Sequence, residues 1–117
     1  MDRKSLIRQY KETARPMGVY RVRNTTTGRC LVGSSIDLPA RLNRHRAQLG
    51  MGRHPNRALQ QDWNDLGPEV FEFEVLDTLK PSELPDYDPA KDLKTLEEIW
   101  IEKLSPDHDL GYNERPK

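Results

Sequence analysis

The sequence lacks the cysteines that a disulfide framework or a structural zinc site requires. Its 1 cysteine, Cys30, cannot form an internal disulfide, and no spacing of cysteine and histidine suits zinc. It also lacks any apolar run near the roughly 20 residues that cross a bilayer. Residues 1–16 are charged throughout, without the apolar centre of a signal peptide. We therefore expect a cytoplasmic protein in which Cys30 is a small apolar strand residue.

Net charge is also lacking, because 19 basic and 19 acidic residues cancel, yet the two signs are unevenly divided. Residues 1–60 hold 13 Lys and Arg against 3 Asp and Glu, whereas residues 61–117 hold 6 against 16. This division favours a polyanionic partner for one face of the protein. The alternative is that the two halves neutralise each other within the fold.

The 117 residues are enough for one domain, and their apolar pattern predicts an α+β fold. We expect a helical extension over 1–16 and a core over 17–113. Strands are predicted over 18–23, 29–34 and 71–75, with a turn at 24–28 and an irregular loop at 80–88. Helices are predicted over 37–50, 56–66 and 89–104. The order predicts a three-stranded, mainly antiparallel sheet flanked by helices.

Polar residues interrupt the apolar stripes of two predicted helices. In the first, Asp37 stands at the N-cap position and His45 occupies the stripe formed by Leu38, Leu42 and Leu49, with Arg41 one turn earlier. In the last helix, Glu97 lies within the stripe of Leu93, Leu96, Trp100 and Leu104. Burying a carboxylate without a partner is costly, so Glu97 should meet a cation, a metal or hydrogen-bond donors. A structural salt bridge to Arg41 is one alternative. In the helix between them, Leu59, Trp63 and Leu66 should face the core.

Six short elements stand in an order that resembles the GIY-YIG endonuclease domain. They are Gly18-Val19-Tyr20, Leu31-Val32-Gly33, Arg41, His45, Glu97 with Trp100-Ile101, and Gly111-Tyr112-Asn113. Each element is weak alone, and their order and spacing make the match specific. The resemblance extends over roughly residues 17 to 113.

The resemblance implies cleavage of DNA phosphodiester bonds with one divalent ion, Mg²⁺ or Mn²⁺. Glu97 would hold the metal, and Arg41 would bind the scissile phosphate. Tyr20 would orient or activate the attacking water as general base, His45 would assist by hydrogen bonding or proton transfer, and Asn113 would order the site.

The sequence departs from the family pattern at the second triplet. Leu31 stands where the family usually has tyrosine, so no hydroxyl is available there to order water. Ser34 stands where some relatives carry a lysine. The Leu31-Val32-Gly33-Ser34-Ser35 version is similar to a bacterial subgroup, whose members stand alone or are joined to transcription-regulator domains.

Polar and basic residues around the triplets are candidates for contact with nucleic acid. They are Arg21, Arg29, Ser34, Arg44, Arg46, Arg53 and Arg57. A homodimer or a partner protein could supply specificity, because relatives often obtain it from an appended domain.

Two other functions remain open at this point. A catalytically silent module could use the same basic face for nucleic-acid recognition or regulation. A protein-interaction domain could use acidic residues of the second half, such as Glu83, Asp86 and Asp88.

Overall fold

The computed structural model describes residues 16–80, 88–104 and 111–113. Its elements follow the chain in the order β1 Met17–Asn24, β2 Cys30–Ser35, α2 Leu38–Gly50, α3 Arg57–Leu66, a 3-10 turn η1 Pro68–Val70, β3 Phe71–Leu79 and α4 Pro89–Leu104. The predicted extension over 1–15 and the loop residues 81–87 lie outside the described residues. No helix of the described residues is long and apolar enough to cross a membrane, and the cytoplasmic location stays a prediction.

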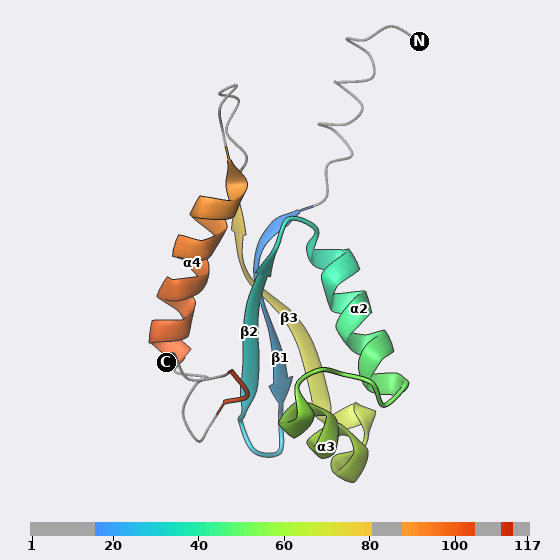
Figure 1. Ribbon diagram of the computed structural model, residues 1–117. Coiled ribbons are helices and arrows are strands. Elements are labelled where there is room, and N and C mark those ends of the chain that lie inside the picture. The colour runs from blue at the N-terminus through green and yellow to red at the C-terminus, as the bar shows by residue number, and fades with distance from the viewer. Residues whose placement is uncertain (1–15, 81–87, 105–110, 114–117) are drawn as a thin grey trace, which may run out of the picture.

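The three strands form one sheet in the order β2-β1-β3, and both strand pairs are antiparallel. Helix α4 lies on one side of the sheet and α2 on the other, as Figure 1 shows. The predicted fold class is therefore confirmed. The end of the third strand was predicted too early: β3 continues to Leu79, because its pairing with β1 extends to Met17.

Each face of the sheet covers its own apolar cluster. On the face of α2 and α3, Val22, Leu49, Leu59, Phe71 and Tyr112 are buried together, with Leu31 and Trp63 packed against them. On the face of α4, Val19, Cys30 and Val32 contact Leu96, Trp100, Ile101 and Leu104. Cys30 is thus a buried strand residue, as predicted. Leu66 was predicted to face the core and does not: it is the last residue of α3 and is 38% exposed.

Helix starts follow the predicted capping residues. The Asp37 side chain accepts a hydrogen bond from the Ala40 N–H at 3.1 Å and begins α2. The Asn56 side chain accepts one from the Leu59 N–H at 3.1 Å and begins α3. These bonds satisfy amides that a helix leaves unpaired at its start. The Asp37 cap fixes where α2 begins and therefore where Arg41 and His45 lie relative to the sheet.

Candidate active site

Tyr20 lies in the middle of the central strand β1, beside an irregularity in its pairing. Val19 pairs with Asp77 but Tyr20 pairs with Val75, so Leu76 is an extra residue in β3. Such a bulge bends the strand and changes the direction of neighbouring side chains. Tyr20 is 5% exposed and lies on the side of the sheet that faces α2.

The glycine of each triplet has a steric reason. A Cβ at Gly33 would overlap the Tyr20 hydroxyl, because Gly33 is the β2 residue paired with Tyr20. A Cβ at Gly18 would overlap the Asp77 carbonyl at the bulge and lie 2.7 Å from the Thr78 Cα. Gly33 therefore leaves room for the Tyr20 hydroxyl to lie over β2, and Gly18 lets the backbone of β3 approach β1.

The predicted stripe of α2 brings His45 to Tyr20. The Tyr20 hydroxyl oxygen lies 2.7 Å from Nε2 of His45, which is 9% exposed. Burial lowers the pKa of His45 to about 4, and the neighbouring His54, Arg41 and Arg44 add to this effect. His45 is therefore neutral at pH 7, and its ring contacts the phenol as a hydrogen-bonding group.

Arg41 and Glu97 both act on the Tyr20 phenol. Burial raises the pKa of Tyr20, the Arg41 guanidinium lowers it, and the Glu97 carboxylate raises it further. The charged groups that act on this phenol of β1 therefore come from two helices, Arg41 from α2 and Glu97 from α4. Arg41 is exposed. The ion pairs among the described residues join other groups, so the alternative of an Arg41–Glu97 salt bridge is not observed.

Glu97 is half-buried and reaches the sheet at β2. Burial raises the pKa of Glu97 and Glu98 adds to the rise, whereas a hydrogen bond from the Ser34 backbone and the charge of Lys94 lower it. Ser34 follows Gly33, against which the Tyr20 hydroxyl lies. The carboxylate and the phenol therefore lie against neighbouring residues of β2, Ser34 and Gly33. No group of three or more His, Cys, Asp and Glu able to hold a metal occurs in the described parts of the chain.

The Asn113 side chain is hydrogen-bonded to the backbone of strand β2. Its side-chain oxygen accepts a hydrogen bond from the Val32 N–H at 2.8 Å, and its amide donates to the Val32 carbonyl at 2.9 Å. The preceding residues extend this contact, because the Tyr112 N–H donates to the Cys30 carbonyl at 2.9 Å. Asn113 thus holds the strand residue next to Gly33, which is a positioning contact.

The predicted nucleic-acid contacts divide into paired and exposed arginines. Arg21 forms an ion pair with Glu74, lowering the pKa of that carboxyl, and Arg29 forms one with Asp62 at 3.2 Å. Arg46 lies over the Phe73 ring, 4.5 Å from its centroid. The exposed arginines of the set are Arg44, Arg46, Arg53 and Arg57. Internal neutralisation therefore accounts for Arg21 and Arg29, and the case for a polyanion rests on the exposed members.

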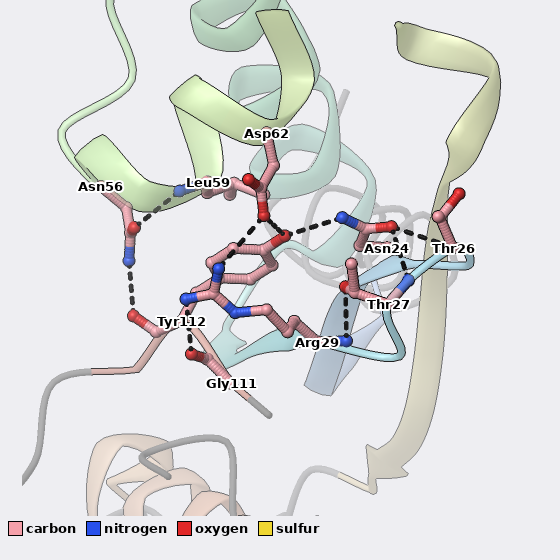
Figure 2. A network of polar contacts seen from close by, with 9 residues as sticks. All are labelled: Asn24, Thr26, Thr27, Arg29, Asn56, Leu59, Asp62, Gly111 and Tyr112. Carbon is pink, nitrogen blue, oxygen red and sulfur yellow. Dashed lines mark hydrogen bonds and ion pairs between the residues drawn. The ribbon is translucent and has the colours of Figure 1, made fainter. Parts of the chain in front are cut away.

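Arg29 belongs to a set of contacts that closes the β1–β2 turn, which we call the turn network (Figure 2): Asn24, Arg29, Asp62 and Tyr112. The Tyr112 hydroxyl donates to Asp62 at 2.6 Å and accepts from the Asn24 amide at 3.1 Å. The Arg29 guanidinium lies 4.4 Å from the Tyr112 ring centroid. Burial and Asp62 raise the pKa of Tyr112 to about 12, so its proton stays in place. The turn network is structural.

Sequence reasoning missed His54. It is 7% exposed, and its Nε2 lies 2.8 Å from Nδ1 of His45. The signal was weak, because His54 lies between α2 and α3, where no helical or strand periodicity indicates the direction of a side chain. Only its position nine residues after His45 could have suggested a pair.

Comparison with known proteins agrees with this fold and arrangement. The model of the GIY-YIG catalytic domain matches residues 16–113. Intron-associated endonuclease 1 of Enterobacteria phage T4 is 36% identical over 97 residues, which are 82% of this chain and 36% of that protein. The chain therefore spans about a third of the length of this curated relative.

Two solved structures share the fold. A mutant of the catalytic domain of intron endonuclease I-TevI matches with a TM-score of 0.71 and 27% identity, over 87% of this chain and 96% of that one. The catalytic domain of the homing endonuclease I-TevI matches with a TM-score of 0.67 and 30% identity, over 86% and 99%. The fold and site define a small α+β nuclease domain. The chain belongs to the GIY-YIG family.

Proposed function

We propose that this protein is an endonuclease that hydrolyses DNA phosphodiester bonds with one divalent ion, Mg²⁺ or Mn²⁺. The observation that carries the proposal is that the buried Tyr20 phenol on β1 hydrogen-bonds to His45 on α2, while the exposed Arg41 on α2, which forms no ion pair among the described residues, and the half-buried Glu97 on α4 act on the charge of that phenol. The strand and helices that carry these residues belong to a domain that is similar to part of an endonuclease.

The residues fit a hard ion held by a single protein carboxylate. Mg²⁺ retains several of its waters and is commonly bound by one or two carboxylates together with substrate phosphate oxygens. Glu97 meets this need, since its carboxylate is half-buried and no ion pair among the described residues engages it. When bound, the ion would supply Lewis acidity at the phosphate and stabilise the leaving oxygen.

Arg41 is the group that would bind the scissile phosphate. Its guanidinium is exposed on α2, has no carboxylate partner among the described residues, and acts on the Tyr20 phenol. A guanidinium binds phosphate oxygens in pairs and offsets the charge that develops as the bond to the leaving oxygen breaks. Arg41 would therefore both place the phosphate and stabilise the transition state.

Tyr20 would take the proton of the attacking water. The water oxygen forms its bond to phosphorus, its proton passes to the Tyr20 oxygen, and the bond to the leaving oxygen breaks with the electron pair on that oxygen. This requires tyrosinate, whose formation at pH 7 needs roughly 4 kcal/mol of differential stabilisation. Leu31 contributes no hydroxyl and packs in the apolar cluster instead. Arg41, His45 and the bound ion would have to supply the stabilisation.

Exposed arginines of α2, of the segment after it and of α3 would hold the DNA backbone. Arg44, Arg46, Arg53 and Arg57 lie on α2, on the segment after it and at the start of α3. Contacts of this kind bind phosphates without reading sequence. A homodimer or a partner protein as the source of specificity stays a prediction.

The test is cleavage of single-stranded, duplex and branched DNA with Mg²⁺ or Mn²⁺. We expect cleavage that Glu97→Gln and Tyr20→Phe abolish. The matched control is Glu98→Gln, which removes the neighbouring exposed carboxylate and should leave cleavage intact. Cleavage that survives Glu97→Gln would contradict the assignment of the metal ligand.

A silent binding module is the second candidate, favoured by the loss of the tyrosine at Leu31 and the 5% exposure of Tyr20. It would bind DNA with an affinity that falls steeply with salt, because phosphate contacts release counterions. It would show no metal-dependent turnover on any substrate of the panel.

A further inference from the structure

Three buried rings form a hydrogen-bonded series that leads from the candidate base into the protein. The Tyr20 hydroxyl lies 2.7 Å from Nε2 of His45, and Nδ1 of His45 lies 2.8 Å from Nε2 of His54. At the inner end, the Asn56 backbone N–H donates to Nδ1 of His54 at 3.0 Å. We call Tyr20, His45 and His54 the ring chain.

The backbone amide at the inner end fixes the direction of every bond in the ring chain. A backbone N–H can only donate, so Nδ1 of His54 is an acceptor and the single proton of the neutral ring lies on Nε2. That proton points at Nδ1 of His45, so the proton of His45 lies on its Nε2. The His45 N–H therefore donates to the Tyr20 oxygen.

Charged forms of the two imidazoles are excluded by the same contacts. A second proton on His45 would place two donors face to face with His54, and a second proton on His54 would oppose the Asn56 amide. Burial lowers the pKa of both histidines, which agrees with neutral rings. The groups that act on His45 are His54, Arg41 and Arg44, and those that act on Tyr20 are Arg41 and Glu97.

The inner end of the ring chain is held firmly. The His54 N–H donates to the Gln60 side-chain oxygen at 3.0 Å, and the Gln60 amide donates to the Leu49 carbonyl at 3.0 Å. Asn56 caps α3, and its side-chain amide donates to the Tyr112 carbonyl at 2.7 Å (Figure 2). The amide that directs the ring chain is thus fixed by α3 and by the segment next to Asn113.

We propose that His54 is a positioning residue that holds His45 in its Nε2–H tautomer, so that the Tyr20 oxygen receives a hydrogen bond from His45 both as a phenol and, after its proton passes to a solvent water, as tyrosinate. The proposal rests on the proposed function only where Tyr20 acts as a base. His45 then cannot take the Tyr20 proton, because its facing nitrogen already carries one. Its part is to stabilise the tyrosinate as a donor.

The direct test is the tautomer of His45 in the free protein. The chain has 3 histidines, so long-range proton–nitrogen NMR spectra of protein with ¹⁵N-labelled histidine can be assigned by single substitutions. At pH 7 we expect His45 to show a protonated Nε2 and an unprotonated Nδ1. A protonated Nδ1 on His45 would overturn the proposal, whether or not the protein cleaves DNA.

Two variants of His54 test the consequence. His54→Leu removes the donor to Nδ1 of His45, which frees His45 to adopt the other tautomer and accept from the phenol. We expect that tautomer to appear and kcat at pH 7 to fall about tenfold, corresponding to about one unit in the pKa of Tyr20, with KM unchanged. His54→Gln can donate its amide to the same nitrogen and should restore most of kcat.

Unchanged tautomer and unchanged kcat in His54→Leu would refute the positioning role. If His54→Leu does not fold, the spectrum of the unaltered protein and that of His54→Gln still decide the question. A correct tautomer in a protein that cuts no DNA would uphold the ring chain and reject the endonuclease proposal alone.

Discussion

The ring chain and the turn network are both polar and both lie between the sheet and its helices, yet they are built differently. In the turn network the cation of Arg29 has the carboxylate of Asp62, and the Tyr112 hydroxyl both donates and accepts. Beside the ring chain, the cation of Arg41 is exposed without such a partner in the described residues, and the Tyr20 hydroxyl has a single side-chain partner there, the Nε2–H of His45, from which it accepts. A cation paired with a carboxylate stabilises the fold, even though the buried Nε of Arg29 has no hydrogen-bond partner among the described residues, whereas an exposed cation without a carboxylate partner is available to a substrate.

The difference between the ring chain and the turn network predicts that, among the variants that test this difference, Arg41→Ala has the largest effect on cleavage. Replacing Arg41 with Ala removes a charge that forms no ion pair among residues 16–80, 88–104 and 111–113, so kcat should fall about 10²–10³-fold, as when one transition-state donor is lost. The thermal midpoint should stay unchanged. Steady-state kinetics with Mg²⁺ and thermal unfolding measure the two effects. A loss of stability in Arg41→Ala would show that the guanidinium has a structural partner.

Acid should destabilise the protein through the ring chain. His45 has an ordinary pKa of 6.5 and a folded pKa of about 4. As the pH falls below 6.5 the unfolded chain takes up a proton that the folded protein refuses until about pH 4, so the free energy of unfolding falls across this window. The expected loss is about 3 kcal/mol.

Urea unfolding at a series of pH values measures the loss. In His45→Gln the part of the slope that His45 contributes should vanish, whereas the titrations of His54, whose pKa is also lowered by burial, and of the carboxyl groups remain. Identical slopes for the two proteins would contradict the buried neutral imidazole.

A substitution in the turn network should lower stability and leave kcat unchanged, the opposite of the result expected for Arg41→Ala. Tyr112→Phe leaves Asp62 and Asn24 without their shared hydroxyl, so stability should fall by about 1–2 kcal/mol. Since Tyr112 does not contact Tyr20, Arg41 or Glu97, kcat should be kept at temperatures where the variant is folded. Chemical denaturation and cleavage assays test both statements. A loss of kcat larger than the loss of folded protein would show that the turn network also affects the candidate active site.

The smallest effect is expected at an exposed arginine. Arg57→Ser should weaken DNA binding by less than about tenfold and lower the slope of log affinity against log salt by about 1, the signature of one lost phosphate contact. Binding titrations at several salt concentrations measure the slope. The control is Lys91→Ser, an exposed cation on α4, which should leave the slope as it is.

Local sequence signals predicted the elements because each is decided by a few neighbouring residues. Asp37 and Asn56 cap the helices where they were expected to, and the alternation in β1 places Val19 and Val22 on opposite faces. The end of β3 could not be predicted, because pairing with Met17 and Gly18 extends that strand. The family pattern supplied Tyr20, Arg41, His45, Glu97 and Asn113, and their catalytic roles stay predictions.

Long-range contacts decided what the sequence left open. The uneven division of charge allowed either a polyanion partner or internal neutralisation. The structure shows that Arg21 and Arg29 are neutralised internally, by Glu74 and Asp62. His54 could not be placed, because its direction depends on the Asn56 amide and the Gln60 side chain.

The contact of residues 111–113 with β2 also protects the sheet. Strand β2 is at an edge, and free edges invite pairing with other chains. Gly111 forms a parallel bridge with Cys30, and the Asn113 side chain occupies both backbone groups of Val32 that a foreign strand would need. A shortened domain that ends at Leu104 would therefore expose this edge and be prone to aggregate through it.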